Sequence, residues 1–494
     1  MLLLGLDIGS SSIKAALVDN RTGTTLGSVF APETEMTIQA PHPGWAEQEP
    51  EIWWQHCCTA VQQLLRQAQA NPADVAAIGI SYQMHGLVAL DAKGETVRPA
   101  IIWCDGRAVP IGEAAYQALG THFCLKKYLN SPGNFTASKL RWVREYEPER
   151  FEKINQFMLP GDYIAFRLTG EIATSVPGLS EGILWDFSQN GLAHDLLAHY
   201  GLDSALVPPV VPTFGIQGRL TANAANQIGL KPGVPLTYRA GDQPNNALAL
   251  GVLRPGDVAA TGGTSGVVYG VMDRPVCDAQ NRVNCFAHVN HQPAVPRIGV
   301  LLCFNGCGIQ YAWLRRILGD DSLSYLEMEH LAASAPVGSD GLCMLPFGNG
   351  PERMLGNRDI GGQIHNLKFN QHGRAHLCRA ALEGVAFSFA YGIGILRDLG
   401  LSLSVIRTGN DNLFQSAIFS ETLANLTGTE IEILATSGAV GAAKAAGVGS
   451  GFFDSPEEAV GNADAVLRYM PGRDAGASQE AYQLWQKVLQ SSIG

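Results

Sequence analysis

The sequence has few charged residues and no basic excess. Only 16% of its 494 residues are Asp, Glu, Lys or Arg, and the acidic residues outnumber the basic ones to give a net charge of −11. Proteins that bind nucleic acids or membrane surfaces need a basic patch that attracts phosphates. We therefore expect no nucleic-acid partner and no membrane partner, and any phosphate recognition must depend on a few local residues.

Long apolar runs and paired cysteines are also missing. No segment is long enough to span a membrane, and the apolar start at residues 1–6 is interrupted by Asp7 and lacks the basic residues of a signal peptide. The ten cysteines are scattered without CxxC spacing, which argues against a zinc site and against a disulfide framework. They predict buried thiols in a reducing cytosol, so we expect a cytoplasmic protein.

What the chain does have is the composition of a large α/β enzyme. Its length exceeds the size at which one hydrophobic core stops growing, which predicts two or three domains. The turn-rich stretch 251–256 suits a boundary, so we divide the chain near residue 250 into domains 1–250 and 251–494. Apolar periodicity predicts helices at 49–69, 375–398, 413–426 and 482–489, and strands at 75–80, 403–407 and 430–434. Strands that alternate with helices favour a layered α/β architecture.

Two similar hairpins are predicted, one in each half of the chain. Strands 2–6 and 13–18 flank Asp7-Ile8-Gly9-Ser10-Ser11-Ser12, and strands 257–260 and 267–271 flank Thr261-Gly262-Gly263-Thr264-Ser265-Gly266. Glycine lets backbone N–H groups approach a phosphate closely, so two such tips could grip a triphosphate. Asp7 at the mouth of the first hairpin suits Mg²⁺, which prefers oxygen ligands. Each tip taken alone could equally be an ordinary tight turn.

Asp242 follows a predicted strand, 237–241, and precedes small helix-forming residues. Open α/β sheets place their ligands at the carboxyl ends of strands, so a carboxylate there can accept a proton from an attacking hydroxyl. The alternative is that Asp242 is the N-cap of the following helix, for which Asp is a preferred residue. The residues by themselves leave these two interpretations open.

Further motifs follow one another in a distinctive order: His42-Pro43-Gly44-Trp45-Ala46-Glu47-Gln48-Glu49-Pro50, Gln83-Met84-His85-Gly86, Trp103-Cys104-Asp105-Gly106-Arg107 and Leu159-Pro160-Gly161-Asp162-Tyr163. Together with the two hairpin tips and Gly241-Asp242, they resemble the FGGY carbohydrate kinases, and within them the xylulose kinases. The resemblance covers essentially the whole chain.

This resemblance implies an α/β fold of two actin-like ATPase (ribonuclease H-like) domains with a cleft between them, the first binding a sugar and the second a nucleotide. It implies ATP-dependent phosphorylation of a ketose, with D-xylulose as the leading substrate, ATP and Mg²⁺ as cofactors, and Asp242 as the catalytic base. A homodimer is compatible with it. The residues expected to contact the sugar are Met84, His85, Trp103, Asp105, Asp242 and Gln243. Those expected to contact ATP are Gly9, Ser10, Ser11, Ser12, Lys14, Gly263, Thr264, Ser265, Gly409, Asn410 and Asn412, and Asp7 is expected to hold the metal.

Several alternatives stay open. Met84 and His85 could be plain core residues, Asp105 and Arg107 a surface ion pair, and the Ala-rich stretch 437–446 a core helix rather than one packed near the nucleotide. The chain departs from the family at Thr408-Gly409-Asn410-Asp411-Asn412, at Gln243-Pro244 and at 347–355. The substrate could therefore be ribulose, L-xylulose, sedoheptulose or another polyol, and the rival outside the kinases is a nucleotide-binding protein on the same fold.

Overall fold

The structure is a computed structural model that describes residues 1–319, 322–410, 412–461 and 465–494. Its contacts divide the chain into two compact units. Unit 1 comprises residues 1–253, 286–298 and 436–462, and unit 2 comprises 254–285, 299–435 and 463–494. A single division near residue 250 therefore describes the chain incompletely, because segments 286–298 and 436–462 return to unit 1.

Unit 1 is built on a six-stranded sheet with the order β11-β12-β5-β1-β2-β3. Strand β1 pairs in parallel with β5, and β5 pairs in parallel with β12. The pairs β1–β2, β2–β3 and β11–β12 are antiparallel. The strands are β1 (Leu2–Ile8), β2 (Ile13–Asp19), β3 (Thr25–Ala31), β5 (Val75–Tyr82), β11 (Phe214–Arg219) and β12 (Pro235–Gly241).

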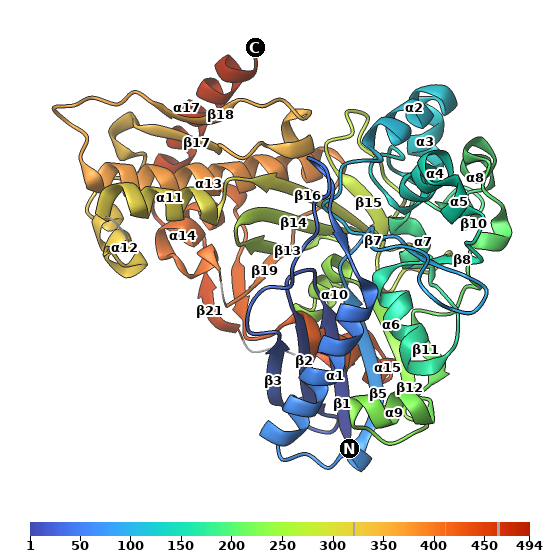
Figure 1. The fold of residues 1–494 in the computed structure, drawn as a ribbon. Coiled ribbons are helices and arrows are strands. Elements are labelled where there is room, and N and C mark those ends of the chain that lie inside the picture. The colour runs from blue at the N-terminus through green and yellow to red at the C-terminus, as the bar shows by residue number, and fades with distance from the viewer. Residues whose placement is uncertain (320–321, 411, 462–464) are drawn as a thin grey trace. The chain divides into compact units, whose positions relative to one another are not determined.

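Two helices cover opposite faces of this sheet. Side chains alternate between the faces along a strand, so the even-numbered and odd-numbered residues of β1 pack against different helices. The even-numbered residues of β1, from Leu2 to Ile8, pack with Trp53 of α1 (Pro50–Gln67), which crosses the strands in Figure 1. The odd-numbered Leu3 packs instead with the alanines of α15 (Gly438–Gly449). The α15 face has no room for side chains at two strand positions: a Cβ on Gly5 would lie 1.8 Å from the Ala439 oxygen, and a Cβ on Gly79 would lie 2.1 Å from the Ala442 oxygen.

The rest of unit 1 consists of short helices and strands around this core. The short strands pair as β4–β7, β6–β8 and β9–β10. These elements are β4 (Glu47–Gln48), β6 (Val88–Leu90), β7 (Ala100–Ile101), α2 (Val109–Leu119), α3 (Thr121–Tyr128), α4 (Thr136–Tyr146), α5 (Pro148–Phe151), β8 (Gln156–Met158), α6 (Pro160–Thr169), α7 (Val176–Glu181), β9 (Trp185–Asp186), β10 (Gly191–Leu192), α8 (His194–Tyr200), α9 (Ala222–Ile228), α10 (Asp242–Ala249) and α16 (Pro456–Val460).

A second sheet has the order β15-β16-β14-β13-β19-β20-β21 and repeats the pattern of the first. An antiparallel hairpin, β13–β14, is followed outward by the parallel strands β19 and β20 and the antiparallel strand β21. This repetition agrees with the duplicated hairpins that the sequence predicts. The strands are β13 (Asp257–Gly262), β14 (Ser265–Met272), β15 (Asn284–Ala287), β16 (Ile298–Asn305), β19 (Val405–Gly409), β20 (Ile431–Leu434) and β21 (Ala465–Tyr469).

The helices of unit 2 include α13 (Arg374–Asp398), which is long and apolar enough to cross a membrane by length and composition. The expectation that no segment is long enough is therefore wrong for this helix. Of its most apolar window, 83% is buried inside the protein, which is typical of a core helix. The other elements are α11 (Gly308–Gly319), α12 (Tyr325–Ala333), β17 (Cys343–Phe347), β18 (Gly361–His365), α14 (Ala417–Thr427) and α17 (Ala475–Ile493).

The predicted elements all exist, with small shifts at their ends. The largest difference is the last helix, which begins at Ala475 rather than near residue 482. All ten cysteines are free thiols, six of them buried, but Cys104 is exposed and does not fit the prediction of uniformly buried thiols.

Candidate active site

Three parallel strands of unit 1 end side by side. In the register, Ile8 of β1 and Gly241 of β12 both lie opposite Tyr82 of β5. The segments that follow these strands therefore start at one edge of the sheet, where α/β proteins place their ligands. They are the Gly9–Ser12 turn, Gln83-Met84-His85 and Asp242, which the sequence analysis selected from separate motifs.

Asp7 faces the N-terminus of α15 because it is the next odd-numbered residue of β1 after Leu3 and Gly5. One of its carboxylate oxygens, Oδ1, accepts a hydrogen bond from the Ser81 hydroxyl at 2.8 Å. The helix begins so close that a Cβ on Gly438 would lie 2.8 Å from Asp7 Oδ2. The stretch 437–446 is thus a core helix whose small residues admit β1 and β5, and whose first turn meets the carboxylate.

The turn after β1 is tight and leaves polar groups accessible. Gly9 N donates to Ser12 O at 3.1 Å, and a Cβ on Gly9 would lie 2.9 Å from the same oxygen. Ser11 and Lys14 are exposed. Ser10 Oγ accepts a hydrogen bond from the indole of Trp103 at 3.2 Å, although that tryptophan is itself exposed.

Asp242 is the first residue of α10 and is half-buried. The N-cap of α10 is Gly241, and no side chain caps the helix there, so the N-cap interpretation of Asp242 is wrong. The pKa of the Asp242 carboxyl is raised to about 7, chiefly by burial and also by the charge of Asp7, while the N–H of Gln243 opposes the rise. A carboxylate with a pKa near neutrality is suited to accept and release a proton.

Met84 lies against Gly241, the residue before Asp242, and His85 follows it in the same turn. Met84 is buried, and its Cγ is 2.6 Å from where a Cβ on Gly241 would stand. The His85 ring packs edge-on against Phe135 with centroids 4.8 Å apart, and its Nδ1 lies 2.9 Å from the carbonyl oxygen of Glu181. A carbonyl can only accept, so Nδ1 carries the proton of the neutral ring.

Glu181, the last residue of α7, is a site residue that the sequence analysis did not identify. Its side chain is buried, and Oε2 lies 2.8 Å from the position of a Cβ on Gly241. Burial raises the pKa of this carboxyl well above its usual value; the Tyr82 hydroxyl lowers it, and the charge of Asp242 raises it. The Glu181 carboxyl therefore lies directly behind the Gly241 backbone, in surroundings that disfavour its charged form. A glutamate inside the short segment Ser180-Glu181-Gly182 carries no sequence signal of burial.

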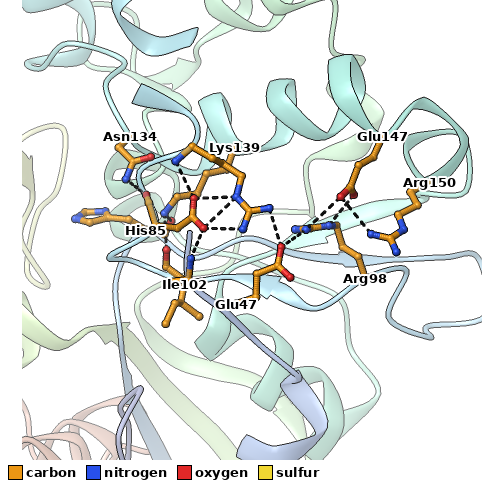
Figure 2. Close-up of polar contacts among 11 residues, drawn as sticks. Glu47, His85, Arg98, Ile102, Asn134, Lys139, Glu147 and Arg150 are labelled. Carbon is orange, nitrogen blue, oxygen red and sulfur yellow. Dashed lines mark hydrogen bonds and ion pairs between the residues drawn. The ribbon is translucent and has the colours of Figure 1, made fainter. Parts of the chain in front are cut away.

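Asp105 and Arg107 do form an ion pair, but it is buried and not on the surface. Arg107 Nη2 lies 2.7 Å from Asp105 Oδ2, and the other oxygen accepts from Arg107 Nε at 2.9 Å. Asp105 Oδ2 also accepts from the Ala46 N–H at 2.5 Å. The chain of charges continues through Glu47 to Arg98, Glu147 and Arg150, which Figure 2 shows as one connected network.

Unit 2 contains a separate cavity of about 480 Å³ next to the second hairpin tip. The tip approaches α11 so closely that Gly308 N donates to Gly263 O at 2.8 Å, and a Cβ on Gly308 would lie 2.6 Å from that oxygen. On the same tip, Ser265 Oγ is 2.7 Å from Asn305 Oδ1. The cavity is lined by residues from four segments: Gly262, Gly263, Gly308, Tyr311, Tyr325, Leu326, Glu329, Asn412, Leu413, Gln415 and Ser416.

The turn after β19 forms another wall of this cavity. The Asn412 side chain organises it: Oδ1 accepts from Phe414 N at 3.0 Å, and Nδ2 donates to the Gly409 carbonyl at 3.3 Å. The carbonyl of Asn410 accepts from the Gln415 side chain. Asp411 of this motif lies outside the described residues. Tyr311 and Tyr325, which sequence reasoning missed, stack at 5.7 Å with a 19° interplanar angle.

Clustered metal ligands do not occur in residues 1–319, 322–410, 412–461 and 465–494, where no three His, Cys, Asp or Glu side chains come together. Asp7, the residue expected to hold the metal, therefore lies outside any such group among the described residues. Such a site suits Mg²⁺, which usually keeps several waters and binds through one or two carboxylates together with substrate phosphates.

Comparison with known proteins gives matches along nearly the whole chain. The N-terminal domain model of the FGGY family of carbohydrate kinases matches residues 2–249, and the C-terminal domain model matches 258–450. The chain is 33% identical to the xylulose kinase of Streptomyces rubiginosus, over 80% of this chain and 77% of the relative. It is 30% identical to that of Escherichia coli K12, over 89% and 87%. The crystal structure of the xylulose kinase from Rhodospirillum rubrum aligns with a TM-score of 0.90 at 27% identity, over 99% of both chains. The prediction of an α/β fold with two actin-like domains is confirmed.

Proposed function

Because the chain belongs to the FGGY family of carbohydrate kinases, we propose that it transfers the γ-phosphoryl group of ATP to D-xylulose and forms D-xylulose 5-phosphate. Two findings favour this ketose. The relatives that match most of the chain are named xylulose kinases. The residues at the end of β5, Gln83-Met84-His85-Gly86, also resemble the sugar motif of that group.

The observation that carries the proposal is the position of Asp242. It stands at the carboxyl end of a parallel strand, next to Met84 and within reach of the charge of Asp7, with a pKa of about 7. As the sugar oxygen attacks the γ-phosphorus, Asp242 takes the hydroxyl proton. The bond from the γ-phosphorus to the bridging oxygen breaks and ADP leaves, and the proton passes from Asp242 to solvent.

We assign the remaining residues around this base. Met84 forms an apolar wall for the sugar, and Nε2 of His85 accepts a hydrogen bond from a sugar hydroxyl, because Nδ1 already donates to the Glu181 carbonyl. Trp103 and Gln243 complete the sugar contacts. Asp105 contributes only as support, since both of its oxygens are engaged by Arg107 and one of them also by the Ala46 N–H.

For the nucleotide we propose two sets of contacts. In unit 1, the Gly9–Ser12 turn and Lys14 contact phosphates, and Asp7 holds Mg²⁺, which neutralises phosphate charge when bound. In unit 2, the nucleoside occupies the 480 Å³ cavity, whose lining includes Gly263 and Gly308. Gly263, Thr264, Ser265, Gly409, Asn410 and Asn412 line or shape it. We also propose that the sugar binds to residues 1–250 and the nucleotide to residues 251–494. The proposed location of the protein is the cytoplasm.

The test is an ADP-release assay with purified protein, ATP, Mg²⁺ and a panel of acceptors: D-xylulose, D-ribulose, L-xylulose, sedoheptulose and a pentitol. We expect the highest kcat/KM with D-xylulose and loss of turnover in Asp242→Asn. Preference for another ketose would leave the phosphoryl transfer as proposed and change only the substrate. Such a kinase is the second candidate, because Gln243-Pro244 in the first turn of α10 differs from the residues usual in the family. If ATP binds and no acceptor stimulates ADP release, the chain is a nucleotide-binding protein and the kinase proposal fails.

A further inference from the structure

His85 has an unfavourable main-chain conformation. Its φ angle is +62°, in the left-handed region that side chains other than Gly, Asn and Asp rarely adopt. The turn at residues 84–85 immediately follows β5 and delivers the imidazole to the site. A conformation of this kind persists only where surrounding contacts hold it.

Lys139 supplies such a contact. Its ammonium donates to the carbonyl oxygen of His85 and to that of Ile102, each at 2.9 Å. Ile102 directly follows β7 and precedes Trp103, so one side chain joins two segments that the sequence analysis assigned to the sugar. Figure 2 shows the Lys139 side chain from α4 reaching these two segments.

Stability alone does not explain a lysine at this position. Lys139 is completely buried, and burial lowers its pKa to about 7, an effect that the nearby charge of Asp105 opposes. Asp105 is already paired with Arg107, so the ammonium acts chiefly on two neutral carbonyls. An apolar side chain of similar volume often gives equal or greater stability at a buried charged position. Lys139 stands here despite this cost, and its two hydrogen bonds join segments assigned to the sugar, which points to a role in the site.

We propose that Lys139 is a positioning residue of the sugar site: by holding the His85 carbonyl, it fixes the left-handed turn that presents the imidazole to the acceptor sugar. This inference rests on the proposed function, since it takes His85 as a sugar contact. The ring is held independently at its other end by the carbonyl of Glu181 and by Phe135. Lys139 therefore controls the main chain, and the aromatic and carbonyl contacts control the ring.

The first experiment compares Lys139→Met with a matched control, Arg98→Met. Arg98 is a second buried cation of the same network, but it is paired with Glu47 and Glu147, away from the His85 turn. We expect Lys139→Met to raise the KM for the sugar by about tenfold or more, because a charge-assisted hydrogen bond to the turn is lost. The KM for ATP should stay within about twofold. Arg98→Met should lower the melting temperature without changing the sugar KM.

The second experiment is a double-mutant cycle with His85→Ala. If Lys139 acts through His85, Lys139→Met should raise the sugar KM much less when His85 is absent. Additive effects would overturn the inference, as would a Lys139→Met variant that melts earlier with an unchanged sugar KM. If Lys139→Met does not fold, Lys139→Gln replaces it in the same cycle, because its amide can still donate to one carbonyl. A normal sugar KM in His85→Ala would overturn the sugar site itself, whereas loss of turnover in Asp242→Asn tests the kinase proposal separately.

Discussion

Replacement of Asp242 by asparagine should remove phosphoryl transfer and at the same time stabilise the protein. The carboxyl has a pKa of about 7 in the folded state against an ordinary 3.8, chiefly because burial disfavours the charged form. Since the folded-state pKa is raised, ionisation costs stability. The cost is absent below pH 3.8, grows as the pH rises and is complete above about pH 7. Asparagine has nearly the same shape and no charge, so the variant avoids the cost.

The size of the effect follows from the two pKa values. The shift corresponds to about 1.7 kcal/mol at pH 5 and about 4 kcal/mol at pH 8. Differential scanning calorimetry without ligands should therefore show a higher melting temperature for Asp242→Asn than for the parent. The difference should be small at pH 5 and on the order of 5 °C at pH 8. Transfer to the sugar should fall by about 100-fold or more, the usual contribution of a general base.

The matched control is Asp105→Asn, a buried aspartate whose charge is paired with Arg107 and hydrogen-bonded by Ala46. Its replacement removes one of the two carboxylates that pair with the buried Arg107, so the melting temperature should fall at both pH values. The reasoning about Asp242 would be refuted if Asp242→Asn also melted earlier at pH 8, because the carboxylate would then be a structural partner. A stabilised variant that still turned over would instead remove Asp242 from the mechanism.

Three further outcomes are expected. In the parent enzyme, kcat/KM for the sugar should fall about tenfold per pH unit below pH 7 as Asp242 is protonated, and a flat profile between pH 6 and 8 would contradict this base. Gly79→Ala should lower stability by about 1–3 kcal/mol in denaturant titration, because its Cβ would lie 2.1 Å from the Ala442 oxygen of α15. Gly191→Ala is the control for overpacking, because Gly191 has no positive φ and its Cβ would have nothing within 4 Å. Gly308→Ala should raise the KM for ATP with the sugar KM unchanged, since its Cβ would press on the Gly263 carbonyl at 2.6 Å, and an unaltered ATP KM would separate this tip from the nucleotide.

The parts of the site that the sequence predicted depend on local patterns. A buried strand followed by glycine and serine residues identified both hairpin tips, and a strand followed by Gly-Asp identified Asp242. Asp7 was predicted at the mouth of the first hairpin, and in the structure it lies on the odd-numbered face of β1. The sequence could not predict that this face meets the N-terminus of α15, because Gly438 lies more than 400 residues farther along the chain.

Lys139 and Glu181 were missed because nothing near them in the sequence indicates burial. Lys139 stands in Ala137-Ser138-Lys139-Leu140-Arg141, where a lysine on a short helix usually faces solvent. Its partners are 54 and 37 residues away, and only the tertiary fold removes it from water. The burial of the Asp105–Arg107 ion pair was not predicted for the same reason. The spacing of the two residues along the chain indicates that they can pair, but it does not indicate that the pair is buried.

At the carboxyl edge of the first sheet, burial and the charges of neighbouring acids together raise the pKa values of the carboxyls of unit 1. Asp7 raises the pKa of Asp242, and Asp242 raises that of Glu181, so each acid makes ionisation of its neighbour harder. Asp162, which also raises the pKa of Glu181, has its own counter-ion in Arg239 at 3.1 Å. Burial and neighbouring charge thus raise the pKa of both carboxyls, and that of Asp242 reaches about 7. A base that accepts a proton in one step and releases it in the next needs a pKa near the working pH, and the fold gives Asp242 such a pKa by burying it where its strand ends.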